Sequence, residues 1–424
     1  MAAPVSPSPD VVVVGAGVIG CSIAYRLAAE GRRVLLLERR GVCSGASGRN
    51  GGMTGAGSSM HARSAAGRAV YALTTRNLDL LRGLELELGC DFQLRLPGSL
   101  DVITTPEQHA HLAESVAEQR AAGIPVQLLD PRETRTLMPA LAPDILGAAY
   151  APDRGHLWPF ALVNGFADAA RRHGADIRTW TSVDGLLRDD ERVVGVVARG
   201  EAIPAGDVVL ATNAYAPELL PELPPGAIVP ARGQILVTEP VAPFLPLPFG
   251  TNFDKEYGRQ TTGGQILCGG YRRLDEAEGL GTYEERVTAP VLSGIARCLG
   301  RLFPALRGGG VDVVRAWSGI MGFTADGLPL IGRYAPAPGL TLAVGFNGGG
   351  FSWGAAVGLV VADLLAGRDP GCDLEPFRPD RFHGAAGPAW ANPFTAGEKN
   401  NPGRLQAEAA APATPVDEAA PVED

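Results

Sequence analysis

The residues whose spacing most clearly indicates chemistry are three glycines near the start of the chain, Gly15, Gly17 and Gly20. They follow the buried-strand pattern Val11–Val14 and open an amphipathic stretch that runs from Gly17 to Glu30, so a strand is predicted to turn directly into a helix. In such a turn the first glycine permits the tight bend, the second lets the backbone approach a pyrophosphate, and the third lets helix and strand pack closely. The helix N-terminus, with Val18 and Ile19, attracts the negative charge. The pattern predicts a dinucleotide site.

Glu38 provides a carboxylate at the end of the second predicted strand, where a dinucleotide site binds a ribose. Glu38 follows a second predicted strand, Val34–Leu37, and can accept hydrogen bonds from the hydroxyls of an adenosine ribose. Arg39 and Arg40 come next and would suit a 2′-phosphate. NAD, NADP and FAD therefore all remain compatible with this motif.

A second glycine-rich segment, "SGASGRNGGMTGAG", spans Ser44 to Gly57. Six of its residues are glycine, and Arg49 and Asn50 stand between them. A linker, a second phosphate loop and the wall of an active site are the three interpretations that its composition allows.

The whole chain limits the classes of function. It has 424 residues, a formal net charge of −9 and 46% hydrophobic residues, as expected of a globular protein larger than one ordinary domain. The charge does not favour nucleic acid or an anionic membrane as a partner. Six widely separated cysteines lack the spacing of a disulfide framework or a metal site, so we expect no metal and a cytoplasmic location. The first residues predict neither a signal peptide nor membrane insertion.

Four segments together resemble one family, the D-amino acid oxidase-like FAD-dependent oxidoreductases, which include glycine and sarcosine oxidases and γ-glutamylputrescine oxidase. They are "GASGRNGGM", "DVVLATNAY" (207–215), "WSGIMGFTADGLPLIGR" (317–333) and "GFNGGGFSWGAAVGLVVADLLAG" (345–367). The resemblance implies an α/β fold, in which a Rossmann-type FAD-binding domain is interleaved with an α+β substrate domain built on a mixed antiparallel sheet.

The predicted organisation follows the same order along the chain. Residues 10–85, 145–225 and 317–383 are expected to form the FAD-binding domain, and residues 86–144 and 226–316 the substrate domain. Residues 1–9 and the acidic, Ala- and Pro-rich tail 384–424 are expected to be disordered, because they cannot bury enough apolar surface.

The resemblance also assigns the glycine-rich segments to FAD. Ser44 to Met53 is expected to run beneath the flavin ring, and the turn before the last helix is expected to face the flavin N1/C2 carbonyl, where a helix N-terminus stabilises negative charge. Besides Gly15, Gly17, Val18, Ile19, Gly20, Glu38 and Arg39, the predicted FAD-binding residues are Ser44, Ser47, Arg49, Asn50, Gly51, Gly52, Met53, Val183, Ala211, Thr212, Gly345, Gly348, Gly349, Gly350 and Phe351.

The implied reaction is oxidation of a C–H bond next to an amine nitrogen. A hydride equivalent passes to flavin N5, and the resulting imine is hydrolysed by water. Arg49, Tyr257 and Arg259 are the candidate catalytic residues, although Tyr257 and Arg259 also fit cross-strand pairs on an exposed sheet. His61 and His156 are interpreted as structural, since a lone histidine is more often structural than catalytic.

Several departures from the relatives affect this interpretation. The cysteine that holds flavin in covalent members is absent near Gly319, so non-covalent FAD is expected. The carboxylate-binding arginine of glycine oxidase-like members falls near Met321, and the corresponding lysine of monomeric sarcosine oxidases falls at Ser352. Arg49, Arg259 or Arg272 could hold a carboxylate instead. The lysine that activates oxygen is missing near Ala277, which leaves dioxygen and other acceptors open.

Other functions compatible with the sequence are a flavin dehydrogenase of 2-hydroxy acids and an FAD-binding subunit of a larger dehydrogenase. A flavin-free NADP reductase fits less well, because it leaves the C-terminal glycine turn unexplained. The substrate is expected to be a small amine or amino acid, and the sequence makes no prediction of the oligomeric state.

Overall fold

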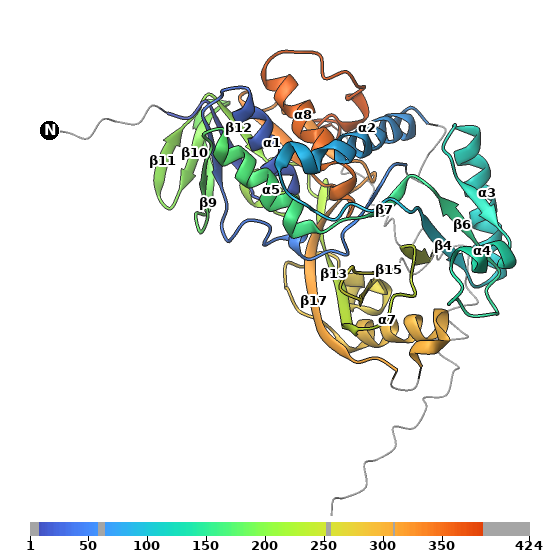
Figure 1. The fold of residues 1–424 in the computed structure, drawn as a ribbon. Helices are drawn as coiled ribbons and strands as arrows, with labels where there is room; N and C mark the ends of the chain where they lie inside the picture. Colours follow the sequence, from blue (N-terminus) through green and yellow to red (C-terminus); the bar gives the residue numbers. More distant parts are fainter. Residues whose placement is uncertain (1–7, 58–63, 252–255, 308–309, 385–424) are drawn as a thin grey trace, which may run out of the picture.

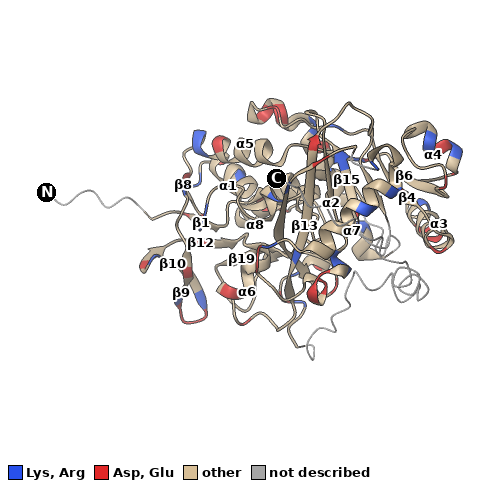
Figure 2. Ribbon diagram, turned by 90° about the horizontal axis from the view of Figure 1, so that it is seen from below, with Lys and Arg blue, Asp and Glu red and all other residues tan. Residues whose placement is uncertain are grey.

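The computed structural model describes residues 8–57, 64–251, 256–307 and 310–384. Two lobes lie side by side, each built on its own sheet, and the chain passes between them several times (Figure 1). Basic and acidic residues are interspersed over both lobes (Figure 2). The predicted disordered ends lie almost entirely outside the described residues, as does His61. No helix of the described ranges is long and apolar enough to span a membrane.

The first lobe is built on a six-stranded sheet whose strands are parallel except for one edge strand. Four consecutive valines can form the central strand because its two faces are both covered: Val11 and Val13 join one core, Val12 and Val14 the other. In order across the sheet the strands are β18 (Leu330–Arg333), β19 (Leu340–Val344), β12 (Asp207–Leu210), β1 (Val11–Val14), β2 (Val34–Leu37) and β8 (Asp176–Arg178).

Helices cover one face of this sheet, and a small antiparallel sheet covers the other (Figure 1). The helices are α1 (Val18–Ala29), α2 (Ala65–Leu88), α5 (Pro159–Arg172) and α8 (Gly354–Leu365). The small sheet consists of β9 (Val183–Asp189), β10 (Arg192–Ala198) and β11 (Glu201–Pro204), and the short α6 (Ala216–Leu219) lies beside it.

The second lobe is built on an eight-stranded mixed sheet. Its only parallel pair among the described strands is β14 with β4. The order is β17 (Val313–Thr324), β13 (Ile228–Pro240), β16 (Gln265–Gly269), β15 (Tyr257–Gln260), β14 (Phe249–Thr251), β4 (Ser99–Ile103), β6 (Gly147–Ala151) and β5 (Gln127–Leu129). Helix α7 (Ala289–Leu302) packs against one part of the sheet, and α3 (Pro106–Ala121) and α4 (Pro131–Leu137) pack near its β4–β6–β5 end.

A two-stranded ribbon, β3 (Met53–Gly55) with β7 (Arg154–His156), lies between the lobes (Figure 1). The α/β fold with a parallel nucleotide-binding sheet and a mixed substrate sheet confirms the predicted fold class. Strands β6 and β17 pair within the eight-stranded sheet, so the sheets change a few residues after the predicted boundaries at 145 and 317. The division into domains is otherwise still a prediction.

Candidate cofactor and active site

A cavity of about 1230 Å³ runs from the N-terminus of α1 to the eight-stranded sheet. It exceeds the roughly 300–1,000 Å³ of ordinary small-molecule pockets. Its wall is built from segments far apart in sequence: the first glycine loop, residues 45–53, the turn after β19, and the inner faces of β13 and β17. Such a volume has room for an extended dinucleotide together with a small substrate.

The first glycine loop leaves the N-terminus of α1 open to this cavity. Gly15 has φ +104°, a left-handed conformation that glycine adopts without a steric penalty. A Cβ on Gly20 would lie 1.8 Å from the Gly15 carbonyl oxygen, so only glycine lets the helix pack this closely. Gly17 caps the helix in an extended conformation without a side-chain bond. The arrangement exposes backbone dipoles to a bound anion.

Glu38 closes the loop from the second strand. Its Oε2 accepts from the Ala16 amide at 2.9 Å and its Oε1 from the Arg40 amide at 2.8 Å. Each carboxylate oxygen keeps further acceptor capacity, and the residue lines the cavity. Glu38 is thus both a fixed part of the wall and an acceptor suited to ribose hydroxyls.

The second glycine segment is folded by its own polar side chains. Asn50 donates Nδ2–H to the carbonyl oxygens of Ala46 and Ser47 (3.0 and 2.7 Å), and its Oδ1 accepts from the Gly52 amide at 2.7 Å. The Ser47 hydroxyl accepts from the Val18 amide at 2.9 Å and ties the segment to α1. The segment is therefore a fixed wall of the cavity, which settles the choice left open by its composition against a linker.

Arg49 lines the cavity while its guanidinium is already engaged. Nε donates to the Ser44 carbonyl at 3.0 Å, and Nη1 donates to the Ser318 carbonyl at 3.1 Å and pairs with Glu285 at 2.7 Å. It therefore joins the cofactor loop to β17 and to the segment before α7. A direct catalytic role for Arg49 remains an untested prediction.

Arg259 is not among the residues that line the cavity, so the structure gives no support to the predicted contact with substrate, which stays untested. It is 7% exposed, and its guanidinium donates to the carbonyls of Gly51 and Leu157 and contacts His156 Nδ1 at 3.3 Å. Burial lowers the pKa of Arg259 to about 10. Burial, followed by the charges of Arg259 and Arg95, lowers the pKa of His156 to about 4. Arg259 thus positions the loop beneath the cavity.

The glycine turn after β19 forms the opposite wall, and two asparagines in left-handed conformations shape it. Asn213 Oδ1 accepts from the amides of Gly345 and Phe346 (3.0 and 3.2 Å), and Asn347 Oδ1 accepts from the Thr324 amide at 2.9 Å. A Cβ on Gly345 would lie 2.5 Å from Thr324 Cγ2. Gly345 therefore permits the turn without lining the cavity.

The helix that follows this turn begins later than the sequence predicts. Gly350–Ser352 forms a 3-10 turn, and α8 starts only at Gly354. The first α8 amides, those of Ala355 and Ala356, donate to Asn77 Oδ1 of α2 at 2.9 and 3.3 Å. The backbone that reaches the cavity is consequently the glycine turn and not the first turn of α8.

The end of the cavity at the eight-stranded sheet is mainly apolar. Met53, Tyr257, Met321 and Phe323 line it together with Arg272, which is 7% exposed. Burial raises the pKa of the Tyr257 phenol well above its usual value, so the phenol stays protonated at neutral pH. No cysteine lies on the described wall, and no metal-binding cluster occurs among the residues that the structure describes.

Most of the predicted cofactor residues lie on the wall of this one cavity. They are Gly15, Gly17, Val18, Ile19, Glu38, Arg39, Ser47, Arg49, Asn50, Gly51, Met53, Val183, Ala211, Thr212, Gly348, Gly349, Gly350 and Phe351. Gly20, Ser44, Gly52 and Gly345 lie behind it as packing or turn residues. The sequence-based list missed Asn213, Tyr215 and Asn347, although their place at the ends of β12 and β19 was a signal that could have found them.

These features fit FAD. The open N-terminus of α1 suits a pyrophosphate, and Glu38 suits a ribose. In the glycine turn, a Cβ added to Gly348 would lie 3.3 Å from Met321 Sδ, so glycine at this position keeps space free between the turn and β17 for a flat ring. Arg39 lies over the Tyr215 ring at 3.8 Å, next to Thr181–Val183, and so marks the far end of the cavity.

Comparison with known proteins agrees with this geometry. The family model described as FAD dependent oxidoreductase matches residues 10–364. The glycine oxidase of Geobacillus kaustophilus is 32% identical over 387 residues, 89% of this chain and 98% of that protein. Its crystal structure aligns with a TM-score of 0.79, 29% identity and coverage of 88% and 98%. The L-proline dehydrogenase of P. horikoshii aligns with a TM-score of 0.77, 27% identity and coverage of 89% and 98%.

The matched region includes every wall segment of the cavity, and FAD is the cofactor of this family. The predicted family and cofactor are thereby confirmed. The chain belongs to the FAD-dependent oxidoreductase family.

Proposed function

We propose that this FAD-dependent enzyme oxidises the carbon–nitrogen bond of a small amino acid or amine. The observation that carries the proposal is the cavity, which extends from the N-terminus of α1, where the backbone suits a pyrophosphate, to an end under the eight-stranded sheet that is lined by Met53, Tyr257, Met321 and Phe323. Two proteins that this chain resembles are named glycine oxidase and L-proline dehydrogenase, which supports a C–N bond as the target.

The chain contributes position and environment, and the bound FAD supplies the two-electron acceptor. The apolar wall of Met321, Phe323 and Tyr257 excludes water from the substrate end. The buried positive charge of Arg272 disfavours a protonated amine in the same end of the cavity, because like charges repel in a poorly solvated site. A neutral amine can lose hydride from its neighbouring carbon without a dedicated base, and water then hydrolyses the imine.

We infer that FAD is held without a covalent bond. Gly319 occupies the wall beside Arg49, and the described wall contains no thiol. Acid precipitation of the purified protein tests this directly: yellow colour should pass into the supernatant. Colour retained in the washed pellet would contradict non-covalent binding.

Anaerobic reduction tests the reaction itself. We expect the absorbance near 450 nm to bleach with at least one member of a panel of glycine, L- and D-amino acids, N-methyl amino acids and simple amines. 2-Hydroxy acids serve as the matched controls that lack nitrogen. Bleaching by hydroxy acids alone would overturn the proposal in favour of C–O oxidation.

The electron acceptor is proposed to be dioxygen, in keeping with the glycine oxidase relative, with a dye or quinone as the alternative that the proline dehydrogenase relative suggests. Admission of air to the substrate-reduced enzyme should restore the yellow colour within seconds and release one peroxide per flavin. Slow reoxidation in air with fast reoxidation by an added quinone would instead identify a dehydrogenase.

A further inference from the structure

We infer that segment 281–288 closes over the cofactor cavity and controls how fast FAD enters and leaves it. The inference concerns the loading of the cofactor, so it holds whichever amine or amino acid the enzyme oxidises. It assigns a function to a segment of the substrate lobe that contributes no residue to the wall of the cavity.

The cofactor cavity passes between two loops at the carboxyl ends of neighbouring strands. Strands β2 and β12 flank the central strand β1 on its two sides. The loop after β2 contributes residues 38–40 to the wall, and the loop after β12 contributes residues 211–213. In a doubly wound sheet a dinucleotide binds in the crevice outside the carboxyl ends of the strands. A segment that contacts both loops therefore spans this crevice.

The carboxylate of Glu285 joins segment 281–288 to the loop after β2. Its two oxygens pair with the two terminal nitrogens of Arg40, at 2.9 and 3.0 Å, and one of them also pairs with Arg49 Nη1 at 2.7 Å. Two parallel bonds between a guanidinium and a carboxylate give a strong and directional contact. Both arginines line the cavity, so one side chain holds the segment at two places on the cofactor wall.

The aromatic side chain of Tyr283 joins the same segment to the opposite loop. Its hydroxyl donates to the Ala214 carbonyl at 3.0 Å, and its ring stacks on Tyr215 with 4.9 Å between the ring centres. The guanidinium carbon of Arg39, in the loop after β2, lies 3.8 Å from the centre of the Tyr215 ring. The three stacked side chains therefore connect the two sides of the crevice.

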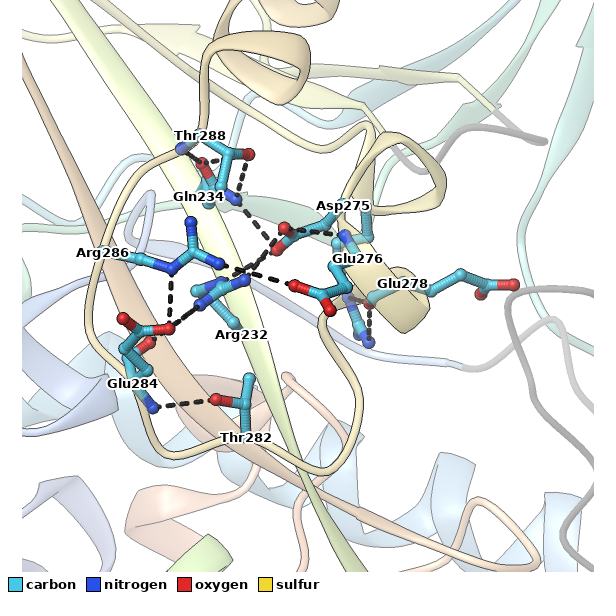
Figure 3. Close-up of polar contacts among 10 residues, drawn as sticks. Arg232, Gln234, Asp275, Glu276, Glu278, Thr282, Glu284, Arg286 and Thr288 are labelled. Atoms are coloured by element: carbon cyan, nitrogen blue, oxygen red, sulfur yellow. Dashed lines mark hydrogen bonds and ion pairs between the residues drawn. The ribbon is translucent and has the colours of Figure 1, made fainter.

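Both ends of the segment are fixed to strand β13 of the substrate lobe (Figure 3). At its start the Gly281 amide donates to the Pro230 carbonyl at 2.9 Å. At its end the Thr288 amide donates to Gln234 Oε1 at 2.7 Å, and Gln234 also donates to the buried carboxylate of Asp275 at 3.0 Å. The part between these two anchors can therefore leave the cofactor lobe while its ends stay in place.

The contacts between the anchors are of a kind that opens locally. The side chain of Glu285 is 24% exposed and Tyr283 is 37% exposed, so no closed apolar core holds the segment down. Gly279 and Gly281 precede these contacts with φ of +68° and +72°. A Cβ on Gly281 would meet nothing within 4 Å, so packing does not restrain the backbone at this point.

The position of Tyr283 and Glu285 outside the cavity wall determines how they affect FAD. Both side chains contact protein groups and do not line the cavity, so the segment closes with a similar free energy before and after FAD binds. A ligand with equal affinity for two states does not change their populations. Weaker contacts therefore raise the open fraction of both forms. The rates of FAD uptake and release then rise by the same factor, and Kd changes little.

Exchange kinetics test this relation. Mixing the FAD-loaded enzyme with a large excess of 5-deazaFAD gives the release rate from the loss of absorbance at 450 nm. Stopped-flow mixing of FAD with the full-length protein after removal of its FAD gives the uptake rate, and the ratio of the two rates gives Kd.

Tyr283→Leu is the first variant, because it changes no charge near the cofactor. We expect both rates to rise about 5-fold or more while Kd changes by less than about 3-fold, since the variant loses a ring stack and a hydrogen bond. Val287→Ala is the matched control: Val287 is also 37% exposed but lies next to the anchor at Thr288. Both rates of the control should stay within about 2-fold of the wild type.

Glu285→Gln tests the contact on the other side of the crevice, and Glu276→Gln is its control, because the Glu276 side chain is 85% exposed. We expect faster uptake and faster release in Glu285→Gln and wild-type rates in the control. A variant that releases FAD faster without faster uptake would show a loss of affinity alone and overturn the inference. Unchanged rates in Tyr283→Leu or in Glu285→Gln would also overturn it.

Discussion

Gly17 is the residue at which the backbone of α1 meets the cavity, and the absence of a side chain there keeps the wall open. A Cβ at this position would lie 2.9 Å from Ser47 Oγ, which already accepts from the Val18 amide. A side chain on Gly17 would therefore crowd the Ser47 hydroxyl at the part of the wall where the pyrophosphate is predicted to bind.

Gly17→Val should therefore abolish FAD uptake by blocking the approach of the pyrophosphate to the backbone. The measurement is the 450 nm absorbance of purified protein after incubation with excess FAD. Gly41→Ala is the matched control, because a Cβ on Gly41 meets nothing within 4 Å. Circular dichroism establishes that both variants fold, and a folded Gly17→Val protein with full FAD content would contradict the assigned site.

His156 makes the stability of the protein depend on pH. Its folded-state pKa of about 4 lies below the ordinary value of 6.5, so the unfolded chain binds the additional proton between these two values. This residue therefore lowers the stability as the pH falls from about 6.5 towards 4, and has no such effect above 6.5.

His156→Gln keeps an acceptor for Arg259 but does not titrate. The difference in unfolding free energy between wild type and variant, measured in urea at a series of pH values, should change in favour of the variant between pH 6.5 and 4. A difference that stays constant over this range would show that His156 does not titrate differently on folding.

The sequence predicted which residues lie at the site better than it predicted the residues to which they are hydrogen-bonded. The spacing of Gly15, Gly17 and Glu38 sufficed to place them on one wall, because a strand–turn–helix unit is a local pattern. Arg259 was expected to face the substrate, yet its partner Gly51 lies 208 positions earlier in the chain. Local periodicity carries no information about such a contact, so the role of Arg259 emerged only from the fold.

At the scale of elements, the segment 275–288 connects the two lobes, and we call it the bridging segment. On one side it is bonded to β13 through Arg232 and Gln234 (Figure 3). On the other side Glu285 pairs with Arg40 and Arg49 of the cofactor lobe. Tyr283 reinforces this contact, since its hydroxyl donates to the Ala214 carbonyl at 3.0 Å and its ring stacks on Tyr215 at 4.9 Å.

Glu285→Gln should destabilise the protein by about 1–2 kcal/mol, since a partly buried carboxylate that serves two guanidinium groups is worth more than an exposed ion pair. Burial opposes ionisation of Glu285, but the bonds and charges of Arg40 and Arg49 outweigh it and lower its pKa. Urea unfolding measures the effect. Glu276→Gln is the control, because Glu276 is 85% exposed and lies 3.7 Å from Arg286; equal losses in both variants would contradict the role of Glu285.

The pair Arg232–Asp275 calls for a different comparison, because each partner is buried. Asp275→Asn should cost about 3–5 kcal/mol, since it removes the buried carboxylate and leaves Arg232 only the exposed carboxylate of Glu284, at 3.3 Å. The double variant Arg232→Met/Asp275→Leu should cost less than the single one, because it buries no charge. Urea unfolding of the three proteins tests this, and a double variant that loses the sum of two large single effects would contradict it.

At the scale of the whole molecule, the cofactor cavity takes its walls from both lobes, so FAD binding should stabilise the entire fold. At a free FAD concentration 100 times its Kd, the expected gain is about 2.7 kcal/mol. Differential scanning calorimetry should show one transition whose midpoint rises with FAD concentration. Riboflavin is the control, because it lacks the pyrophosphate and adenosine for which the N-terminus of α1 and Glu38 are the predicted binding groups. An unfolding midpoint that does not respond to FAD would contradict a binding site shared by the lobes.

Sequence patterns described the nucleotide-binding lobe more closely than the substrate lobe. The predicted strands Val11–Val14 and Val34–Leu37 coincide with β1 and β2, and Gly31 and Gly367 take left-handed conformations just after their helices. These elements follow each other directly in sequence. In the eight-stranded sheet, β4 pairs with β14 nearly 150 positions later, and in the turn Glu276–Gly279 the non-glycine residues Ala277 and Glu278 take left-handed conformations as well as Gly279. Their geometry depends on tertiary contacts.

The hydrogen bonds of Asn77 affect the free energy of FAD binding, because they order the backbone around the glycine turn before FAD binds. In the middle of α2 it donates to the Phe351 carbonyl at 3.1 Å and accepts from the first amides of α8, while Thr54 donates to the same carbonyl at 3.0 Å. These bonds join three separate segments around the glycine turn, and the chain makes all of them by itself. The conformational entropy of ordering this turn is thus lost during folding and not during FAD uptake. A rigid receptor of this kind lets more of the interaction energy appear as affinity for the flavin.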